Sequence, residues 1–268
     1  SQLVQKACIS KEVAEKLHLV GEKGYDVFGG RITIPIRDRQ RRIIGFTARL
    51  LDEPKPKAGE SDKHKNPAKY MNSSDSLIYN KSKSIFGIDL AWREAAKKER
   101  FYIVEGAPDC MRLHIIGVLN AVAPLGTAWT EENLTTLKRV AKHLCFLPDA
   151  DPPKPGEKYG PGIKAVIKSG EEAMKLGFNV SVKQIPVGME KQDPDTFCKN
   201  RTLFDGLEEM DFILWMADIL FEDGMIDAEK GKVIKRLSSL MATMEDDTTM
   251  EMYIAKLTQY VGTKSMYS

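Results

Sequence analysis

Two aspartates one residue apart follow the hydrophobic stretch that ends at Leu147. Residues 140–147 (VAKHLCFL) have the composition of a buried strand, whose side chains alternate between the two faces of a sheet. Asp149 and Asp151 are therefore expected to point the same way just beyond that strand. Two like charges in one small space need water between them, a proton on one of them, or a cation that bridges them. A lone Asp-x-Asp is commonly a solvated turn, so the surrounding sequence has to decide.

Further carboxylates follow other strand-like segments. Glu105 ends the segment FYIVEG, and Asp193 and Asp195 lie in QDPDTF after the segment NVSVKQIP. Strand-like and helix-like segments alternate over residues 101–200, which predicts βαβ units and a parallel sheet. Ligands of such sheets bind beyond the carboxyl ends of the strands, so these carboxylates should gather at one edge, where hard oxygen ligands suit Mg²⁺. The alternative is that each aspartate only caps its own turn or helix.

Charge is unevenly distributed along the 268 residues. The net charge is +2, but residues 31–100 contain 17 Lys and Arg against 9 Asp and Glu, a local charge of +8. Residues 201–268 contain 7 against 13, a local charge of −6. A basic segment predicts a surface for a polyanion such as nucleic acid, and a merely solvated basic face is the alternative.

The cysteines and the hydrophobic pattern limit the class of protein. The four cysteines are far apart and form no Cys-x-x-Cys pair, so we expect neither a zinc ribbon nor a disulfide framework. No apolar run approaches the roughly 20 residues that span a bilayer, and no signal peptide opens the chain. We therefore expect a cytoplasmic protein that contacts no membrane. The chain starts with Ser-Gln rather than Met, and we expect it to be a piece of a longer protein.

The remaining segments suggest three parts. Residues 10–20 have helical spacing, and residues 31–51 contain two alternating β-rich runs around a charged turn, which predicts a hairpin. The polar residues 52–65 should form a loop. From residue 201 the chain has helical periodicity and no strand signal. The expected division is a basic α+β part over residues 1–100, a parallel α/β part over 101–200 and a helical part over 201–268.

The carboxylate pattern resembles the Toprim domain of bacterial-type primases, topoisomerases and some nucleases. Its signature is a Glu-Gly after one strand, here at Glu105, and an Asp-x-Asp after a later strand, here at Asp149 and Asp151. Two details depart from the usual pattern: the first motif reads Glu-Gly-Ala-Pro-Asp, and Asp-Ala-Asp stands for Asp-Gly-Asp. The chain also inserts PPKPGEKYGP at residues 152–161, which could alter access of template or nucleotide to the site.

The segment before residue 100 is similar to the basic subdomain of DnaG-type primases. That family has a Phe-Pro-Ile-x-Asp hairpin, a Gly-Phe-x-x-Arg strand, a Pro-Lys-Tyr-x-Asn-Ser run and an apolar pair before a lysine. The matching positions here are 34–38, 45–49, 69–73 and 78–81. The opening and closing helical segments resemble the rest of that catalytic core. The resemblance implies an α/β chain with a basic N-terminal α+β subdomain, a central Toprim parallel sheet and a C-terminal helical subdomain. It also implies that the chain is a divergent member of the primase family, similar to those of phages or mobile elements.

The resemblance implies template-directed synthesis of RNA primers on single-stranded DNA from ribonucleoside triphosphates. Mg²⁺ or Mn²⁺ would stabilise the attacking and leaving oxygens, with no structural zinc in this chain. The expected catalytic residues and metal ligands are Glu105, Asp149 and Asp151, joined as ligands by Asp193 and Asp195. Asp109 would support the site. The residues expected to contact nucleic acid or nucleotide are Arg49, Lys69, Tyr70, Asn72, Lys81, Gly126 and Thr127. A replicative helicase would be a partner, through a domain absent here.

Other functions fit the same residues. A Toprim nuclease would use these carboxylates to activate water, and only the basic subdomain argues against it. A topoisomerase fragment is disfavoured because the chain shows no sign of the domains that carry its tyrosine nucleophile. A catalytically inactive nucleic-acid-binding module is the third alternative, and metal-dependent activity would exclude it.

Overall fold

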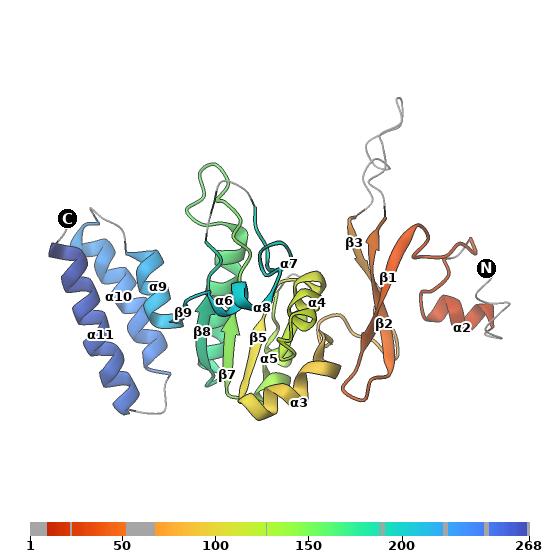
Figure 1. Ribbon diagram of the computed structural model, residues 1–268, viewed down its shortest axis with the longest axis horizontal. Coiled ribbons are helices and arrows are strands. Elements are labelled where there is room, and N and C mark those ends of the chain that lie inside the picture. The colour runs from red at the N-terminus through yellow and green to blue at the C-terminus, as the bar shows by residue number, and fades with distance from the viewer. Residues whose placement is uncertain are drawn as a thin grey trace.

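The computed structural model describes residues 10–21, 23–51, 68–126, 128–186, 188, 191–221, 225–243 and 247–266. Figure 1 shows a small antiparallel sheet near one end, a mixed sheet in the middle and long helices at the other end. The loop expected over residues 52–65 and the expected site residue Thr127 lie outside the described residues. No helix among the described residues combines the length and the apolar character needed to cross a membrane.

The N-terminal part is a short helix followed by an antiparallel sheet. Helix α2 (Lys11–Lys16) starts after Ser10, whose side chain accepts a hydrogen bond from the backbone N–H of Val13. The strands are β1 (Arg31–Arg37), β2 (Ile43–Leu50) and β3 (Tyr70–Asn72), in the order β1-β2-β3. The hairpin predicted for residues 31–51 is thus confirmed, with Ile34 opposite Thr47.

The central sheet has six strands in the order β4-β6-β5-β7-β8-β9. They are β4 (Ile85–Phe86), β5 (Arg100–Ile103), β6 (Ala121–Pro124), β7 (His143–Phe146), β8 (Asn179–Lys183) and β9 (Glu209–Asp211). The four inner strands are parallel, as expected, and each edge strand is antiparallel to its neighbour. The sheet therefore takes strands from all three expected parts. The prediction that no strand follows residue 201 was wrong. Strand β9 lies there, but it has only three residues and depends on its pairing with β8, so the local sequence carried no signal for it.

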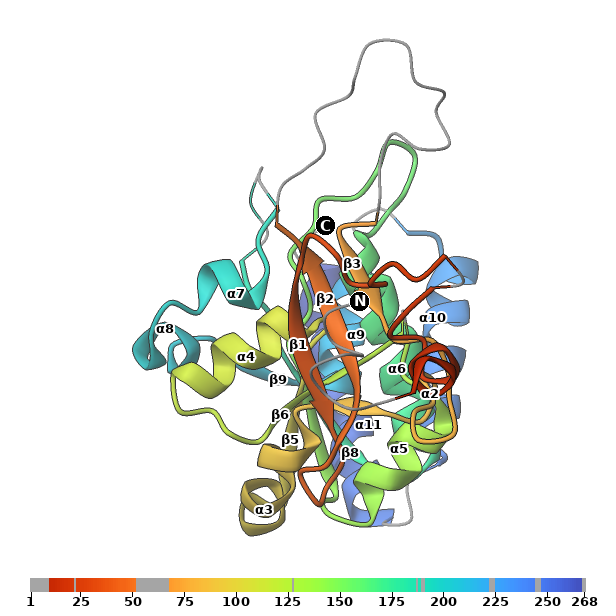
Figure 2. The same cartoon turned by 90° about the vertical axis from the view of Figure 1, so that its right-hand side faces the viewer.

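Helices cover both faces of the central sheet. They are α3 (Ile88–Lys98), α4 (Ala107–Ile115), α5 (Glu131–Lys138), α6 (Pro161–Lys175), α7 (Pro194–Phe197) and α8 (Arg201–Asp205). Alternate strand residues enter two separate cores: Phe101 packs with α5 and α6 residues, and Tyr102 packs with α4 and α8 residues. Figure 2 shows α4 on one side of the sheet and α5 and α6 on the other. Ile36 of β1 belongs to the α4 core, so the two sheets share buried packing.

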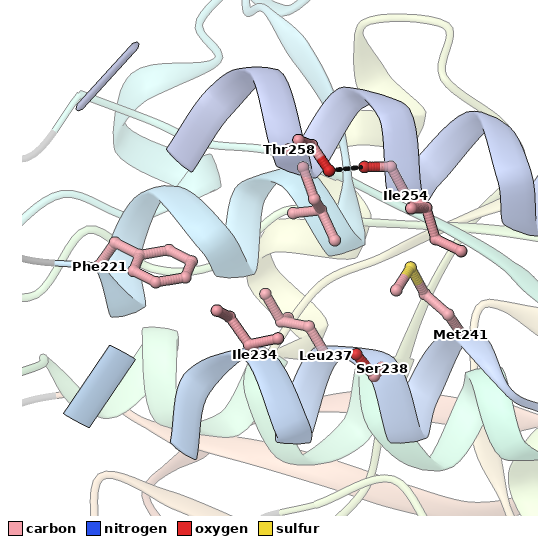
Figure 3. Close-up of a pocket in the computed structure, with 8 residues that line it drawn as sticks. Phe221, Ile234, Leu237, Ser238, Met241, Ile254 and Thr258 are labelled. Carbon is pink, nitrogen blue, oxygen red and sulfur yellow. Dashed lines mark hydrogen bonds between the residues drawn. The ribbon is translucent and has the colours of Figure 1, made fainter. Parts of the chain in front are cut away.

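Three helices form the C-terminal part. They are α9 (Phe212–Leu220), α10 (Asp227–Met241) and α11 (Asp247–Met266), and residues of α9 and α10 continue the core on the α6 face. An apolar hollow of about 300 Å³ lies between them, and Figure 3 shows Leu237 of α10 and Ile254 of α11 facing it. Thr258 donates its hydroxyl to the carbonyl of Ile254, which keeps this polar group satisfied within the helix.

The contact between α6 and α9 can be tested at a glycine. A Cβ at Gly170 would overlap the ring of Phe212, which is fully buried. We expect Gly170→Ala to destabilise the protein by about 1–3 kcal/mol, because the steric overlap outweighs the better helix propensity of alanine. Urea denaturation measures the change.

Gly231, in the exposed part of α10, provides the matched control. A Cβ there meets no described atom within 4 Å beyond its chain neighbours and the nearby backbone of its own helix. We expect Gly231→Ala to raise the free energy of unfolding by about 0.5–1 kcal/mol. Equal effects of the two substitutions would contradict the packing of α6 on Phe212.

Candidate active site

A cavity of about 540 Å³ lies between the small sheet and the carboxyl edge of the central sheet. Its two walls carry opposite charges. The wall from β2 and β3 presents Thr47, Arg49, Lys69, Tyr70 and Asn72. The wall from the central sheet presents Glu105, Asp109, Gly126, Asp149, Asp193 and Asp195, together with Lys191. Of the carboxylates predicted for one edge of the sheet, all but Asp151 line this cavity, opposite Arg49 and Lys69.

The pair that follows β7 is bridged by a lysine. The Nζ atom of Lys191 lies 2.9 Å from Oδ2 of Asp151 and 3.3 Å from Oδ2 of Asp149. The other carboxylate oxygens, Oδ1 of Asp149 and Oδ1 of Asp151, are buried and have no hydrogen-bond partner among the described residues. The pair thus has a bridging cation on one side and two unsatisfied acceptors on the other.

Glu105 is joined to this pair through the backbone. Its Oε1 accepts a hydrogen bond of 3.1 Å from the backbone N–H of Asp149. The first turn of α6 packs directly above: a Cβ at Gly162 would lie 2.5 Å from the carbonyl oxygen of Asp149 and 2.6 Å from Oε1 of Glu105. Only glycine fits this contact without a shift of the site.

Burial dominates the electrostatics of these carboxyls. It raises the pKa of Asp149 to about 7, and the charges of Glu105 and Asp109 act in the same direction while Lys191 opposes them. Burial also raises the pKa of Glu105, although the N–H of Asp149 favours its ionised form. A bound cation would stabilise the ionised form of a carboxylate cluster whose burial opposes ionisation in this way.

Asp109 connects two loops of the acidic wall. Its Oδ2 accepts from the backbone N–H of Gly106 and its Oδ1 from that of Asp195, each at 3.1 Å. Burial raises the pKa of Asp109 to about 7, against the effect of the N–H donor of Asp195. Asp109 thus holds the backbone at Gly106 and at Asp195 together, and its supporting role in the site stays a prediction.

The two aspartates of QDPDTF, Asp193 and Asp195, form contacts with residues other than the Asp149–Asp151 pair. Asp193 is the N-cap of α7, where its side chain accepts from Thr196 N–H at 2.8 Å. Oδ1 of Asp195 pairs with Nε of Arg112 at 3.0 Å. Within the described ranges, no group of three or more Asp, Glu, His or Cys side chains is arranged so that it could hold a metal ion. Metal ligation by the five carboxylates stays a prediction.

The basic wall is tied to the sheet edge by one hydrogen bond. Nδ2 of Asn72 donates to the carbonyl of Leu125 at 2.5 Å, which links β3 to the end of β6. Arg49 lies over the ring of Tyr70, with 5.8 Å between its Cζ atom and the ring centroid. Lys81 is not among the residues that line the cavity, although its Cε would lie 4.0 Å from a Cβ at Gly126.

Sequence reasoning missed Lys191, Thr47 and Arg112. Thr47 is buried in the cavity wall, and Arg112 reaches Asp195 from 83 residues away. A signal for Lys191 was present, because two aspartates one residue apart call for a counter-charge and this lysine stands two residues before Asp193.

Comparison with known proteins finds two family matches along the chain. The family described as DNA primase catalytic core, N-terminal domain, matches residues 1–92, and the Toprim-like family matches residues 102–198. The DNA primases of Clostridium acetobutylicum and Mycolicibacterium smegmatis are each 30% identical, over 244 and 281 residues. These alignments cover 89% and 97% of this chain but 37% and 40% of those proteins, so the chain spans about two fifths of their length.

Solved structures share the fold. The RNA polymerase domain of Mycobacterium tuberculosis primase DnaG, solved in complex with double-stranded DNA, is 28% identical and superposes with a TM-score of 0.71. The match covers 97% of this chain and 80% of that one. The similarity therefore includes both walls of the cavity.

The raised pKa of Asp149 predicts how stability depends on pH. The folded state holds the Asp149 proton up to about pH 7, whereas the unfolded chain releases it near pH 3.8. The stability from this proton is therefore complete below about pH 3.8, falls as the pH rises, and is lost once the pH has passed about 7. Asp149→Asn keeps the side chain neutral, so we expect it to match the wild type near pH 4 and to exceed its stability by about 1–3 kcal/mol near pH 8. Urea denaturation with a chelator at each pH measures this.

A carboxyl with the opposite shift serves as the control. The hydrogen bond and charge of Lys98 lower the pKa of Glu94 on α3. Glu94→Gln should therefore cost stability at neutral pH and not at acidic pH. A pH-independent difference between Asp149→Asn and the wild type would contradict the burial effect.

Proposed function

Because the chain belongs to the family of DnaG-type primase catalytic cores, we propose that it synthesises short RNA on a single-stranded DNA template from ribonucleoside triphosphates. The observation that carries this proposal is the lysine-bridged pair of Asp149 and Asp151, of which Asp149 lines the cavity opposite a basic wall. Such a pair of walls suits a substrate that is a polyanion and a reaction that builds negative charge.

Although no three of the described acidic side chains are already arranged as a metal site, their oxygen donors have the chemistry that a hard divalent cation prefers, and we propose Mg²⁺ or Mn²⁺. Asp149 and Asp151 each contribute a buried oxygen without a partner in the described part of the chain, and Glu105 lies beside them. Asp193 and Asp195 would join as ligands by leaving Thr196 and Arg112. When bound, the ion would neutralise charge on the attacking and leaving oxygens of a nucleotidyl transfer.

The protein's own residues would position the substrates. Arg49 and Lys69 line the wall opposite the carboxylates and would hold phosphates of template or nucleotide. Tyr70 is 37% exposed, so its ring is available for contact with a sugar or base. Glu105 would orient the reacting hydroxyl or complete the metal site. On family resemblance alone, a replicative helicase is a further proposed partner.

The catalytic proposal is tested with wild type, Asp149→Asn and Glu105→Gln. Each protein is incubated with labelled single-stranded DNA, four ribonucleotides and Mg²⁺ or Mn²⁺, and the products are sized. We expect short RNA from the wild type and at least about 100-fold less from either variant, because each loses a charge at the reacting centre.

Two comparisons make the result specific. Glu251→Gln, on the exposed surface of α11, should retain full activity. Shortened DNA in place of new RNA would assign the same carboxylates to a nuclease. DNA binding without either product would contradict an enzyme altogether.

The basic wall is tested separately by binding. We expect Lys69→Ala and Arg49→Ala each to weaken single-stranded DNA binding and to reduce the slope of log K against log salt by about 0.7, the value for one lost phosphate contact. Fluorescence anisotropy over a salt series measures both quantities. Lys97→Ala, an exposed residue on α3 outside the cavity, should leave the slope unchanged.

A further inference from the structure

Lys191 reaches the aspartate pair from the loop between β8 and α7, and the backbone fixes its position. The backbone N–H of Ala150 donates to the carbonyl of Gln192 at 2.7 Å, in an isolated antiparallel bridge. The residue between the two aspartates is thus paired with the residue directly after Lys191. This bridge places the lysine alongside both carboxylates.

The three side chains differ in exposure. The side chain of Lys191 is 58% exposed, whereas those of Asp149 and Asp151 are 11% and 17% exposed. The ammonium group therefore lies on the solvent side of a buried pair. Its flexible four-carbon stem allows it to leave without disturbing the core.

One ammonium satisfies this pair only in part. Lys191 contacts one oxygen of each carboxylate and brings a single positive charge to two acidic groups. Oδ1 of Asp149 and Oδ1 of Asp151 keep no hydrogen-bond partner within the described residues. A divalent ion would supply the second charge, and it would compete with the ammonium for the same carboxylates.

We propose that Lys191 is a resident counter-cation, which occupies the Asp149–Asp151 pair when the divalent ion is absent and is displaced when that ion binds. This inference rests on the proposed metal site. Lys191 is then a positioning residue that keeps the metal-free pair together and lowers its apparent affinity for the ion. The cost of displacing the lysine is subtracted from the binding free energy of the metal.

The test measures Mn²⁺ binding without template or nucleotide. Wild type, Lys191→Met and Asp149→Asn are titrated with Mn²⁺ near pH 8.5, and free Mn²⁺ is followed by electron paramagnetic resonance. Methionine keeps most of the length of the unbranched side chain and removes its charge. We expect Lys191→Met to bind Mn²⁺ about 3- to 10-fold more tightly than the wild type, and Asp149→Asn to bind more weakly.

Two matched variants and a stability readout complete the design. Lys199→Met, an exposed lysine shortly after α7, should bind Mn²⁺ like the wild type. Lys191→Gln should reproduce the result of Lys191→Met. In chelator Lys191→Met should unfold at a lower temperature than the wild type, and Mn²⁺ should raise its Tm by more.

Each result has one meaning. Equal or weaker binding by Lys191→Met, with wild-type binding that depends on Asp149, would overturn the counter-cation and leave the proposed metal site intact. No binding by any of these proteins would overturn the counter-cation and the proposed metal site together. Tighter binding that Lys191→Gln shares and Lys199→Met lacks supports the displacement.

Discussion

The buried carboxylates at the carboxyl edge of the parallel sheet are the constraint to which the surrounding structure is fitted. Strands β5 and β7 are neighbours, so the residues that follow them, Glu105 and Asp149, must lie together. Water is largely excluded there, and the raised pKa of Asp149 shows that ionisation is opposed. Backbone N–H groups and one lysine compensate in part, and the absence of a Cβ at Gly162 lets α6 pack onto the cluster.

The second wall of the cavity depends on how the small sheet is attached. Ile36 enters the core on the α4 face, and Asn72 bonds to the carbonyl of Leu125 at the end of β6. These contacts place Arg49 and Lys69 on the wall of the cavity opposite the carboxylates. If the positive groups lay within ion-pair distance, they would neutralise the carboxylates directly. Their separation leaves both walls charged and available to a ligand that carries phosphate groups and cations together.

The sequence predicted the features that depend on a local periodic pattern of apolar residues. The four parallel strands, the hairpin over residues 31–51 and the carboxylates at one sheet edge follow from periodicity and from the rule for parallel sheets, and the structure contains them. Features that depend on a distant partner were not predictable. Strand β9 exists through its pairing with β8, and Arg112 meets Asp195 only after α4 and α7 pack. The position of Lys191 beside the two aspartates likewise depends on the bridge between Ala150 and Gln192.

The aspartate pair of the site carries a large electrostatic cost. Several of the described ion pairs join side chains on a single helix, such as Lys16 with Glu12 and Arg201 with Asp205, and these contribute little to stability. By contrast, Asp149 is buried, shares one ammonium with Asp151 and has an unsatisfied oxygen. A protein evolving for stability alone would replace this pair with neutral residues, as buried ion pairs elsewhere can be replaced without loss. The presence of this pair is explained if its unsatisfied oxygens bind a cation, because a site built to bind charge destabilises the protein until its ligand is bound.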